Sequence, residues 1–360
     1  MHIEEDPERG ILNPRGKREA EKNSSALISR DVESGKIVEF EQEDALFAVF
    51  KRGKAGYINK DGKMMIEPQF DRARHFSEGL APIRIGDTWG YIDKIGRIVI
   101  SLLFDIDKVK NAGEFYLGSF CEGLARVEVG GKWGVEIVGR WGYIDKSGKI
   151  VIEPKFNHAW NFTEGLAVVS LAKKWGFIDK TGKIAIDLLF NSVHSFSEGL
   201  APVKVGDRWG YIDKSGKIVI APKYENAYPF REGLAQVEVA DKWGFIDKSG
   251  KIVIEPQWEF AHRFSEGLAC VEVSNKHGYI SKSGEMVIKP QFQESFGFSE
   301  RLARVRIGCK WGFIDKKGDM AIKPQFDEAM EFSHGLAYVT INGKMGYINR
   351  HGEYVWDSTN

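Results

Sequence analysis

The sequence is poor in cysteine, contains no long hydrophobic run and carries no excess charge of one sign. Its 360 residues include three cysteines, Cys121, Cys270 and Cys309, and this odd, widely spaced set is neither a disulfide framework nor a Cys-x-x-Cys metal motif. No stretch approaches the about 18 apolar residues that predict a membrane-spanning helix. The 51 Lys+Arg balance the 51 Asp+Glu, which argues against a dedicated nucleic-acid binder.

The usual sequence marks of catalysis are also missing. The eight histidines form no His-x-His or His-x-x-x-His pair, and neither a Gly-x-x-x-x-Gly-Lys-Ser/Thr loop nor a Gly-x-Ser-x-Gly elbow occurs. We therefore expect no enzyme activity, no catalytic residue, no cofactor and no metal site. The polar N-terminus lacks the apolar core of a signal peptide, which, with the few cysteines, slightly favours a cytoplasmic location.

A repeat dominates the chain instead. The pair Trp-Gly recurs at six repeat positions and once more at Trp133-Gly134 in the enlarged third unit, and Ala55, His277 and Met345 take the place of Trp in the same phase. From Gly142 to Gly346 every step is 34 residues, so the chain holds nine units, the third enlarged by insertions at 105–119 and 135–140. The six tryptophans, which we interpret as structural repeat positions, are Trp89, Trp141, Trp175, Trp209, Trp243 and Trp311.

The units share the pattern L-A-x-V-x-V-x-x-K-W-G-F/Y-I-D-K-x-G-K-I-V-I-x-P-x-F-x-x-A-x-x-F-S-E-G. With this pattern, the chain from roughly Leu46 to Trp356 resembles the WG-repeat (KWG-repeat) family of bacterial proteins. The resemblance implies a β-rich repeat architecture. It implies no settled biochemical activity, so it carries over no catalytic residues.

Within each unit we expect three strands. L-A-x-V-x-V alternates, which is typical of a strand with one buried face. In W-G-F/Y-I-D, a glycine such as Gly210 leaves room for a close backbone or for a neighbouring aromatic ring. K-I-V-I is apolar on both parities, which predicts a strand buried on both faces and ended by the following proline. F-x-x-A-x-x-F favours one helical turn, whose last phenylalanine belongs to the core between units.

The hairpin turns carry a recurrent acidic residue that looks structural. Asp and its substitutes Asn and Ser share a side-chain oxygen that can accept a turn amide. Each Asp-Lys-x-Gly-Lys tip carries a charge of about +1, and the Glu of Ser-Glu-Gly is expected away from it, so stacked units would form separate basic and acidic lines. The turn aspartates are Asp93, Asp145, Asp179, Asp213, Asp247 and Asp315.

Three strands in about 34 residues cannot bury their apolar faces alone, so neighbouring units must stack. We predict an all-β fold, a tandem array of nine three-stranded units forming an open β superhelix, with a closed or near-closed β-propeller as the alternative. Residues 1–24 are predicted to be a polar disordered tail, 25–45 a capping hairpin, 46–356 the array and 357–360 a tail. Terminal units facing solvent would explain Ala55 and Met345.

The predicted function is a non-enzymatic repeat scaffold that binds an unidentified protein or peptide through an extended β surface. The alternative is a carbohydrate or cell-envelope binding module that uses exposed tryptophans. Candidate binding residues are Phe115 and Tyr116 in the first insertion, and Trp160 and Trp258, because only their units carry Trp at those places. Burial of the repeated tryptophans would count against the alternative.

Overall fold

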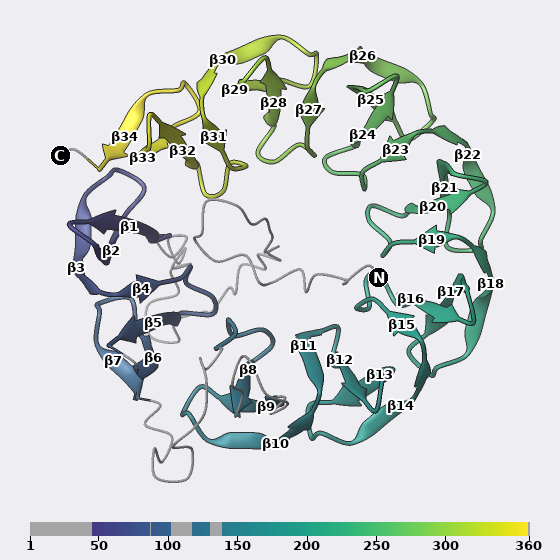
Figure 1. Ribbon diagram of the computed structural model, residues 1–360, viewed down its shortest axis with the longest axis horizontal. Helices are drawn as coiled ribbons and strands as arrows, with labels where there is room; N and C mark the ends of the chain where they lie inside the picture. The colour runs from purple at the N-terminus through teal and green to yellow at the C-terminus, as the bar shows by residue number, and fades with distance from the viewer. Residues whose placement is uncertain (1–44, 87, 102–116, 130–138, 359–360) are drawn as a thin grey trace, which may run out of the picture.

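The chain folds into a ring of nine small β-sheets (Figure 1). The computed structural model describes residues 45–86, 88–101, 117–129 and 139–358. The last sheet lies beside the first, so the ring is a closed nine-bladed β-propeller. The all-β prediction and the nine repeat units are confirmed; the favoured open superhelix was wrong, and its alternative, the closed propeller, is what the chain forms.

Blades are numbered in chain order, and each contributes up to four antiparallel strands from the inside of the ring outward (Figure 1). The inner strands are β4 (Arg72–Ala73), β11 (His158–Thr163), β15 (Ser192–Val193), β19 (Asn226–Ala227), β23 (Phe260–Ala261), β27 (Glu294–Ser295) and β31 (Glu328–Ala329). The second strands are β1 (Phe47–Lys51), β5 (Ala81–Ile85), β8 (Leu124–Val129), β12 (Leu166–Leu171), β16 (Leu200–Val205), β20 (Ala235–Val239), β24 (Leu268–Val273), β28 (Ala303–Ile307) and β32 (Ala337–Ile341).

The third strands carry the Trp-Gly motif, and the fourth strands form the outer edge. The third strands are β2 (Lys54–Ile58), β6 (Thr88–Ile92), β9 (Arg140–Asp145), β13 (Lys174–Asp179), β17 (Arg208–Asp213), β21 (Lys242–Ile246), β25 (Lys276–Ser281), β29 (Lys310–Ile314) and β33 (Lys344–Ile348). The outer strands are β3 (Met64–Phe70), β7 (Ile98–Ser101), β10 (Ile150–Phe156), β14 (Ile184–Phe190), β18 (Ile218–Tyr224), β22 (Ile252–Trp258), β26 (Met286–Phe292), β30 (Met320–Phe326) and β34 (Tyr354–Asp357).

The glycine of the Trp-Gly motif lets the outer strand cross close above it. In blade 5, Trp209 pairs with Tyr224 and Tyr211 pairs with Ile220, so the outer strand bulges between these pairs. A Cβ atom on Gly210 would lie 2.5 Å from the carbonyl oxygen of Ile220 and 2.7 Å from the nitrogen of Pro222. Of the two sequence-based explanations for this glycine, a close backbone is therefore the correct one.

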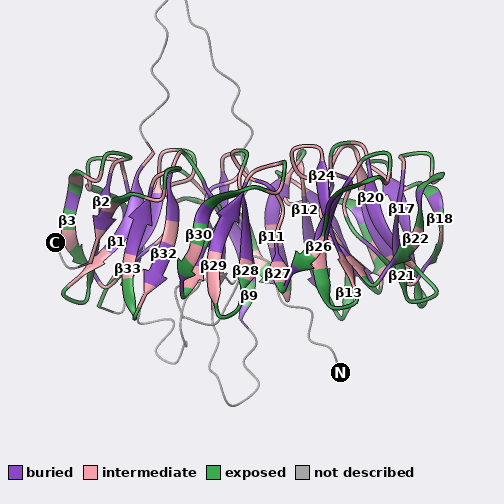
Figure 2. Ribbon diagram, turned by 90° about the horizontal axis from the view of Figure 1, so that it is seen from above, coloured by how far each residue is buried: buried purple, intermediate pink, exposed green. Residues whose placement is uncertain are grey.

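Three local predictions were wrong, two of them because the fourth strand is the outer edge of its sheet. In β18, Ile218 is 45% exposed and Val219 is 41% exposed, whereas Ile220 is 4% exposed, so K-I-V-I is not buried on both faces (Figure 2). Pro222 lies inside the strand, since an outer edge needs no amide donor. The segment predicted as a helical turn is the two-residue inner strand, Asn226–Ala227.

The hydrophobic core is divided among the joints between blades. At the joint of blades 5 and 6, Trp209 and Tyr211 pack against Ala235 and Val237. The second strand is buried on both faces, because Gln236 is buried as well, so the prediction of one buried face was wrong. The phenylalanine predicted to lie between units does so: Phe230 is fully buried, 5.0 Å from the ring of Tyr211 in the preceding blade.

A carboxylate staple joins consecutive blades on one face of the ring. Glu198 of blade 5 accepts the amide of Gly233 in blade 6 at 3.1 Å, and pairs with Lys248 of the same blade at 3.0 Å. The Glu of Ser-Glu-Gly and the Lys of the hairpin turn therefore form ion pairs and not the separate acidic and basic lines that were predicted. They meet because the loops that carry them lie at the same end of neighbouring blades. The seven carboxylates that pair in this way are Glu78, Glu122, Glu164, Glu198, Glu232, Glu266 and Glu300.

Blades 9 and 1 meet at a joint called here the seam. No described strand pairing links them; instead Phe47 and Val49 pack against Tyr347 and Trp356. The Tyr347 hydroxyl donates to the carbonyl oxygen of Ala48 at 3.0 Å. Ala55 is fully buried, in the core cluster that blade 1 shares with blade 2, so exposure to solvent does not explain why it replaces Trp.

Candidate interaction surface at the inner strands

One position per blade, directly after the buried small residue of the inner strand, carries an aromatic or imidazole ring in blades 4 to 8. These five side chains, Trp160, His194, Tyr228, His262 and Phe296, are called here the inner aromatic arc. Ring centroids of Trp160 and His194 lie 6.1 Å apart, and those of His194 and Tyr228 lie 5.4 Å apart. His262 and Phe296 follow at 5.6 Å. Between blades 6 and 7 the link is indirect: Tyr228 lies 5.7 Å from Trp243, Trp243 lies 5.6 Å from Phe260, and Phe260 lies 4.9 Å from His262.

The repeated tryptophans support the arc from behind. His194 stacks on Trp209 with centroids 5.0 Å apart and 23° between the planes. Tyr228 lies 5.7 Å from Trp243, and Phe296 lies 5.8 Å from Trp311. Tilted and stacked aromatic pairs at such distances contribute about 0.5–1.5 kcal/mol each beyond their buried area. The arc therefore has a rigid aromatic backing.

Buried phenols fix the backbone of the arc. The hydroxyl of Tyr211, in the preceding blade, donates to the carbonyl oxygen of Tyr228 at 2.8 Å, and Tyr279 does the same for Phe296. Burial raises the pKa of Tyr211 and of Tyr279 well above the usual 10. Both phenols therefore remain protonated donors at any ordinary pH.

An arginine reinforces the blade 8 end of the arc. The Arg304 guanidinium lies 3.8 Å from the ring centroid of Phe296 and 5.6 Å from that of Trp311. Its Nη1 donates to the carbonyl oxygen of Ala329 at 2.6 Å, which carries the contact into blade 9. A cation over aromatic faces at this separation is attracted by the electron-rich ring faces.

The arc combines fixed geometry with accessible rings. Tyr228 is 38% exposed, and Trp160, His194, His262 and Phe296 are partly exposed. By contrast, the phenylalanine two positions further on is buried in all five of these blades, as with Phe196 and Phe230. Exposed rings with polar tips and locked backbones can give a partner both apolar contact and hydrogen bonds at little entropic cost.

Two of the four candidate binding residues fall within the described chain, and the structure separates them. Trp160 is partly exposed and belongs to the arc, 6.0 Å from Trp175. Trp258 is 9% exposed and pairs with Trp243 across β21 and β22, so it is not the exposed contact that its sequence position suggested. Phe115 and Tyr116 lie outside the described residues, as do most of the two insertions and residues 1–44.

The repeated tryptophans do not form an exposed row. Trp89, Trp141, Trp209 and Trp243 are buried, while Trp175 and Trp311 are partly buried in joint cores. A row of tryptophans along the surface, on which the carbohydrate alternative depended, is therefore absent from the described part of the chain.

The turn aspartates act on their own hairpins. In blade 5, Oδ1 of Asp213 accepts the amides of Ser215 and Lys217 at 2.9 and 3.1 Å, and the Ser215 hydroxyl at 2.6 Å. The Ser215 hydroxyl, followed by the two amides, holds the pKa of Asp213 below its usual 3.8. The six predicted turn aspartates all accept the same two amides, and this arrangement occupies one carboxylate oxygen of each.

Blade 7 contains a polar cluster that sequence reasoning missed. His277 replaces the usual Trp, and its Nδ1 lies 3.3 Å from Sγ of Cys270, which is 2.9 Å from Oγ of Ser295. Burial raises the pKa of the Cys270 thiol to about 12, the opposite of what an activated nucleophile needs. The cluster is a buried hydrogen-bonded filling of the space that Trp occupies elsewhere.

The arc itself was readable in part from the sequence. Aligning the units places Trp160, His194, Tyr228, His262 and Phe296 in one column. The tryptophan pattern alone predicts an exposed contact at Trp160 and does not identify the other four rings. Whether these side chains are buried or accessible depends on which strand lies innermost in the sheet. The sequence predicts a helical turn in the segment that forms this inner strand.

The sheets, their order around the ring and the joint packing define a β-propeller of nine blades. The chain belongs to the family described as "WG containing repeat", whose model matches residues 56–89, 89–106, 116–133, 141–175, 175–209, 209–243, 243–276, 278–311 and 311–344. No curated protein matches the chain in sequence.

Solved structures are similar in fold. The crystal structure of a eukaryotic initiation factor matches with a TM-score of 0.63 and 13% identity, over 88% of this chain and 96% of that one. Sqt1 from Chaetomium thermophilum, bound to the N-terminus of ribosomal protein L10, matches with a TM-score of 0.40 and 10% identity, over 65% of this chain and 84% of that one. Within the described residues, no helix is long and apolar enough to cross a membrane.

Proposed function

We propose that the protein is a non-enzymatic scaffold that binds another protein or a peptide, and that the inner aromatic arc is the binding surface. The observation that carries the proposal is the run of five rings in consecutive blades, accessible to solvent and held on a rigid backing. Tyrosine and tryptophan are the residues that most often dominate binding energy at protein interfaces.

The pattern of variation within the repeat supports this assignment. The buried phenylalanine of the joint is the same residue in blades 4 to 8, as packing requires, whereas the arc position changes among Trp, His, Tyr and Phe. Packing against the tryptophan backing accounts for a ring at this position. Packing does not explain why the polar groups of the rings differ from blade to blade. A partner that carries different groups along its length would form hydrogen bonds with these different rings.

A photocrosslinking experiment tests the proposal. Benzoylphenylalanine replaces Tyr228 in one variant and Val219, on the outer strand of blade 5, in the control. In cells, the variant at 228 should give a discrete protein adduct that the control lacks. Adding His194→Ala and His262→Ala, on either side, should reduce the adduct at least tenfold, since two contacts each worth about 1 kcal/mol are lost.

Equal adducts from both positions, or adducts indifferent to His194→Ala and His262→Ala, would show that the arc is not the binding surface. A glycan array covers the alternative: glycan binding that Trp160→Ala abolishes would favour a carbohydrate-binding module. Glycan binding of this kind, together with no protein adduct at position 228, would overturn the proposal.

A further inference from the structure

The seam is a joint of the ring at which the described residues form no carboxylate staple. Strand register aligns Lys60 of blade 1 with Lys248 of blade 6, since both follow the first turn residue after the third strand. It also aligns Ala45 with Gly233, whose amide binds the staple carboxylate. The residue in the position of Glu198 is His334. A basic residue therefore stands where seven other joints have a glutamate.

The contacts of His334 differ from those of the staple glutamate. Its backbone keeps the left-handed turn conformation of the staple residue, with φ of 53° against 55° for Glu198. Its Nδ1 lies 2.9 Å from Oγ of Ser333, and its ring meets the edge of Phe47 at 6.4 Å between centroids. Among the described residues, Lys60 has no ion-pair partner, whereas its seven counterparts each bind a carboxylate.

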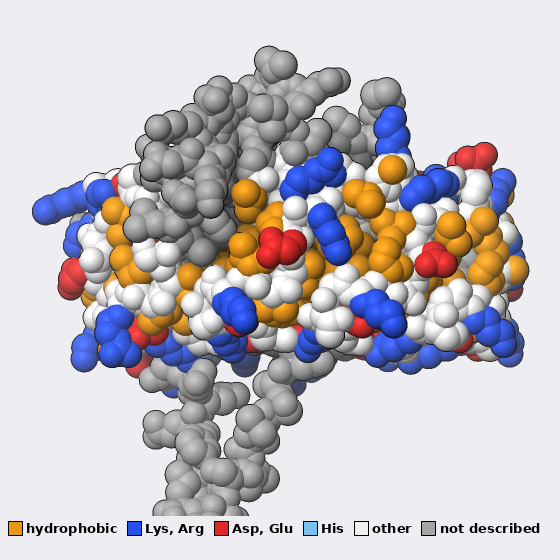
Figure 3. All heavy atoms as spheres, turned by 90° about the horizontal axis from the view of Figure 1, so that it is seen from below, with side chains coloured by type: hydrophobic (Ala, Val, Ile, Leu, Met, Phe, Trp, Pro, Cys, Tyr) orange, Lys and Arg blue, Asp and Glu red, His pale blue; other side chains and the backbone are white. Residues whose placement is uncertain are grey.

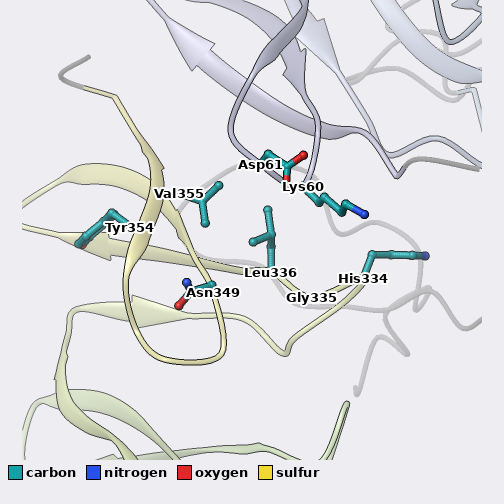
Figure 4. A pocket seen from close by; sticks show the side chains of 8 residues that line it. All are labelled: Lys60, Asp61, His334, Gly335, Leu336, Asn349, Tyr354 and Val355. Carbon is teal, nitrogen blue, oxygen red and sulfur yellow. The ribbon is translucent and has the colours of Figure 1, made fainter.

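A cavity of about 510 Å³ opens at this place. Lys60 and Asp61 line it from blade 1, and His334, Leu336, Asn349 and Val355 line it from blade 9. In Figure 4, the Lys60 and His334 side chains extend toward the same side from loops that face each other. Asn349 Oδ1 already accepts the amides of His351 and Glu353. Of the described residues that line the cavity, Lys60 supplies the ammonium group.

We propose that the seam cavity binds a carboxylate supplied by a partner, an acidic side chain of a peptide or protein, in the place that glutamate fills at the other joints. The chemistry of the socket is known from seven copies in the same chain: a main-chain amide and an ammonium or guanidinium group around one carboxylate. Among the described residues that line the cavity, Asp61 is the acidic one, and its charge opposes the ligand. The site is independent of the inner aromatic arc.

Fluorescence polarisation with a labelled Glu-Ser-Glu-Ser-Glu-Ser peptide and the full chain tests the proposal. His334→Glu supplies the missing carboxylate from the chain itself, so it should weaken peptide binding at least tenfold, as should Lys60→Ala, because a charge-assisted hydrogen bond is lost. Asp61→Asn should tighten binding. Lys248→Ala removes the same charge from a socket that Glu198 already fills, and should leave peptide affinity unchanged.

A gain-of-function variant completes the test. Glu198→His opens a second socket beside Lys248 and should raise the peptide stoichiometry from one toward two. The proposal is overturned if the peptide does not bind, if Lys248→Ala weakens binding as much as Lys60→Ala, or if His334→Glu has no effect. It is equally overturned if binding is seen only after Glu39, Glu41 and Glu43 are changed to Gln, because the acidic segment of the chain itself then holds the socket.

Discussion

At the scale of single residues, glycine has two distinct uses, and blade 5 contains both. Gly210 has an ordinary strand conformation but no space for a side chain, because the outer strand crosses above it. Gly199, in the Ser-Glu-Gly turn, has open space around it but a φ of 87°. The first is required by contact and the second by backbone conformation.

These two uses predict different costs for the same substitution. Gly210→Ala places a Cβ atom 2.5 Å from a backbone oxygen and should destabilise the fold by about 2–3 kcal/mol, because the strand must shift. Gly199→Ala should cost about 1 kcal/mol, from the left-handed backbone alone. Thermal unfolding followed by circular dichroism measures both; a larger loss for Gly199→Ala would contradict this account of the Trp-Gly motif.

The turn aspartates predict how stability depends on pH. Hydroxyl hydrogen bonds from Ser147, Thr181, Ser215 and Ser249 are the largest influence that lowers the pKa of Asp145, Asp179, Asp213 and Asp247. Since the folded pKa is below the unfolded value near 3.8, the contribution is complete above that pH and is lost as pH falls through the folded value.

Melting temperature should therefore drop below about pH 4. Changing all four aspartates to Asn keeps an oxygen acceptor and removes the titration, so the variant should show a shallower acid decline. The comparison is a series of melting curves from pH 6 to 2.5. An acid decline as steep as that of the unaltered chain would assign the acid sensitivity to groups other than these four aspartates.

At the scale of strands and blades, the joint is the unit that holds the structure. Phe230 is fully buried against Tyr211 of the preceding blade, so Phe230→Ala should cost about 3–5 kcal/mol. The staple is partly exposed, with Lys248 47% exposed, and Lys248→Ala should cost less than about 1 kcal/mol. Denaturant titration of the two variants ranks them; a reversed order would mean that ion pairs rather than packing hold the joint.

The sequence predicted much at this scale and failed where the ring geometry decides. The Asp turns and the joint phenylalanine follow from local chemistry, and the structure contains both. The alternating pattern predicted a strand correctly but not its burial on both faces. K-I-V-I was misjudged because its two-sided apolar pattern is that of a buried strand, yet Ile218 and Val219 lie at the outer edge. Hydrophobic side chains form a band along this outer wall between Lys and Arg residues (Figure 3). No local pattern says which strand of a sheet is outermost.

At the scale of the whole molecule, closure depends on the seam. The described residues form a tyrosine hydrogen bond and an apolar cluster there but no glutamate staple. We expect backbone amides of β1 and β34 to exchange with solvent faster than those of β16 and β17, because local opening begins where fewest contacts must break. Hydrogen-exchange mass spectrometry measures this.

Tyr347→Phe removes the hydroxyl that donates to Ala48 across the seam, and should speed exchange in β1 about fivefold, the effect of about 1 kcal/mol. Tyr211→Phe, which removes the hydrogen bond from the equivalent tyrosine hydroxyl between blades 5 and 6, should leave the exchange rate of β1 unchanged. Uniform exchange around the ring in the unaltered protein would mean that the seam is as tight as the other joints.

The open superhelix was predicted because no strand shared between the two ends was visible in the sequence, and no described strand pairing links those ends. The ring closes through side chains instead. Closure depends on the angle that each joint adds, and that angle is set by packing between blades rather than by a motif.

Each joint presses one face of a blade against the opposite face of the next, which is the head-to-tail arrangement that builds a ring when its rotation closes and a filament when it does not. The propeller is in this sense a tethered oligomer whose subunits are copies of one sequence segment. A duplication or loss of one 34-residue unit would leave every remaining joint locally satisfied while spoiling closure. Closure of the whole ring therefore determines the number of blades, and a wrong number would disrupt packing first at the seam.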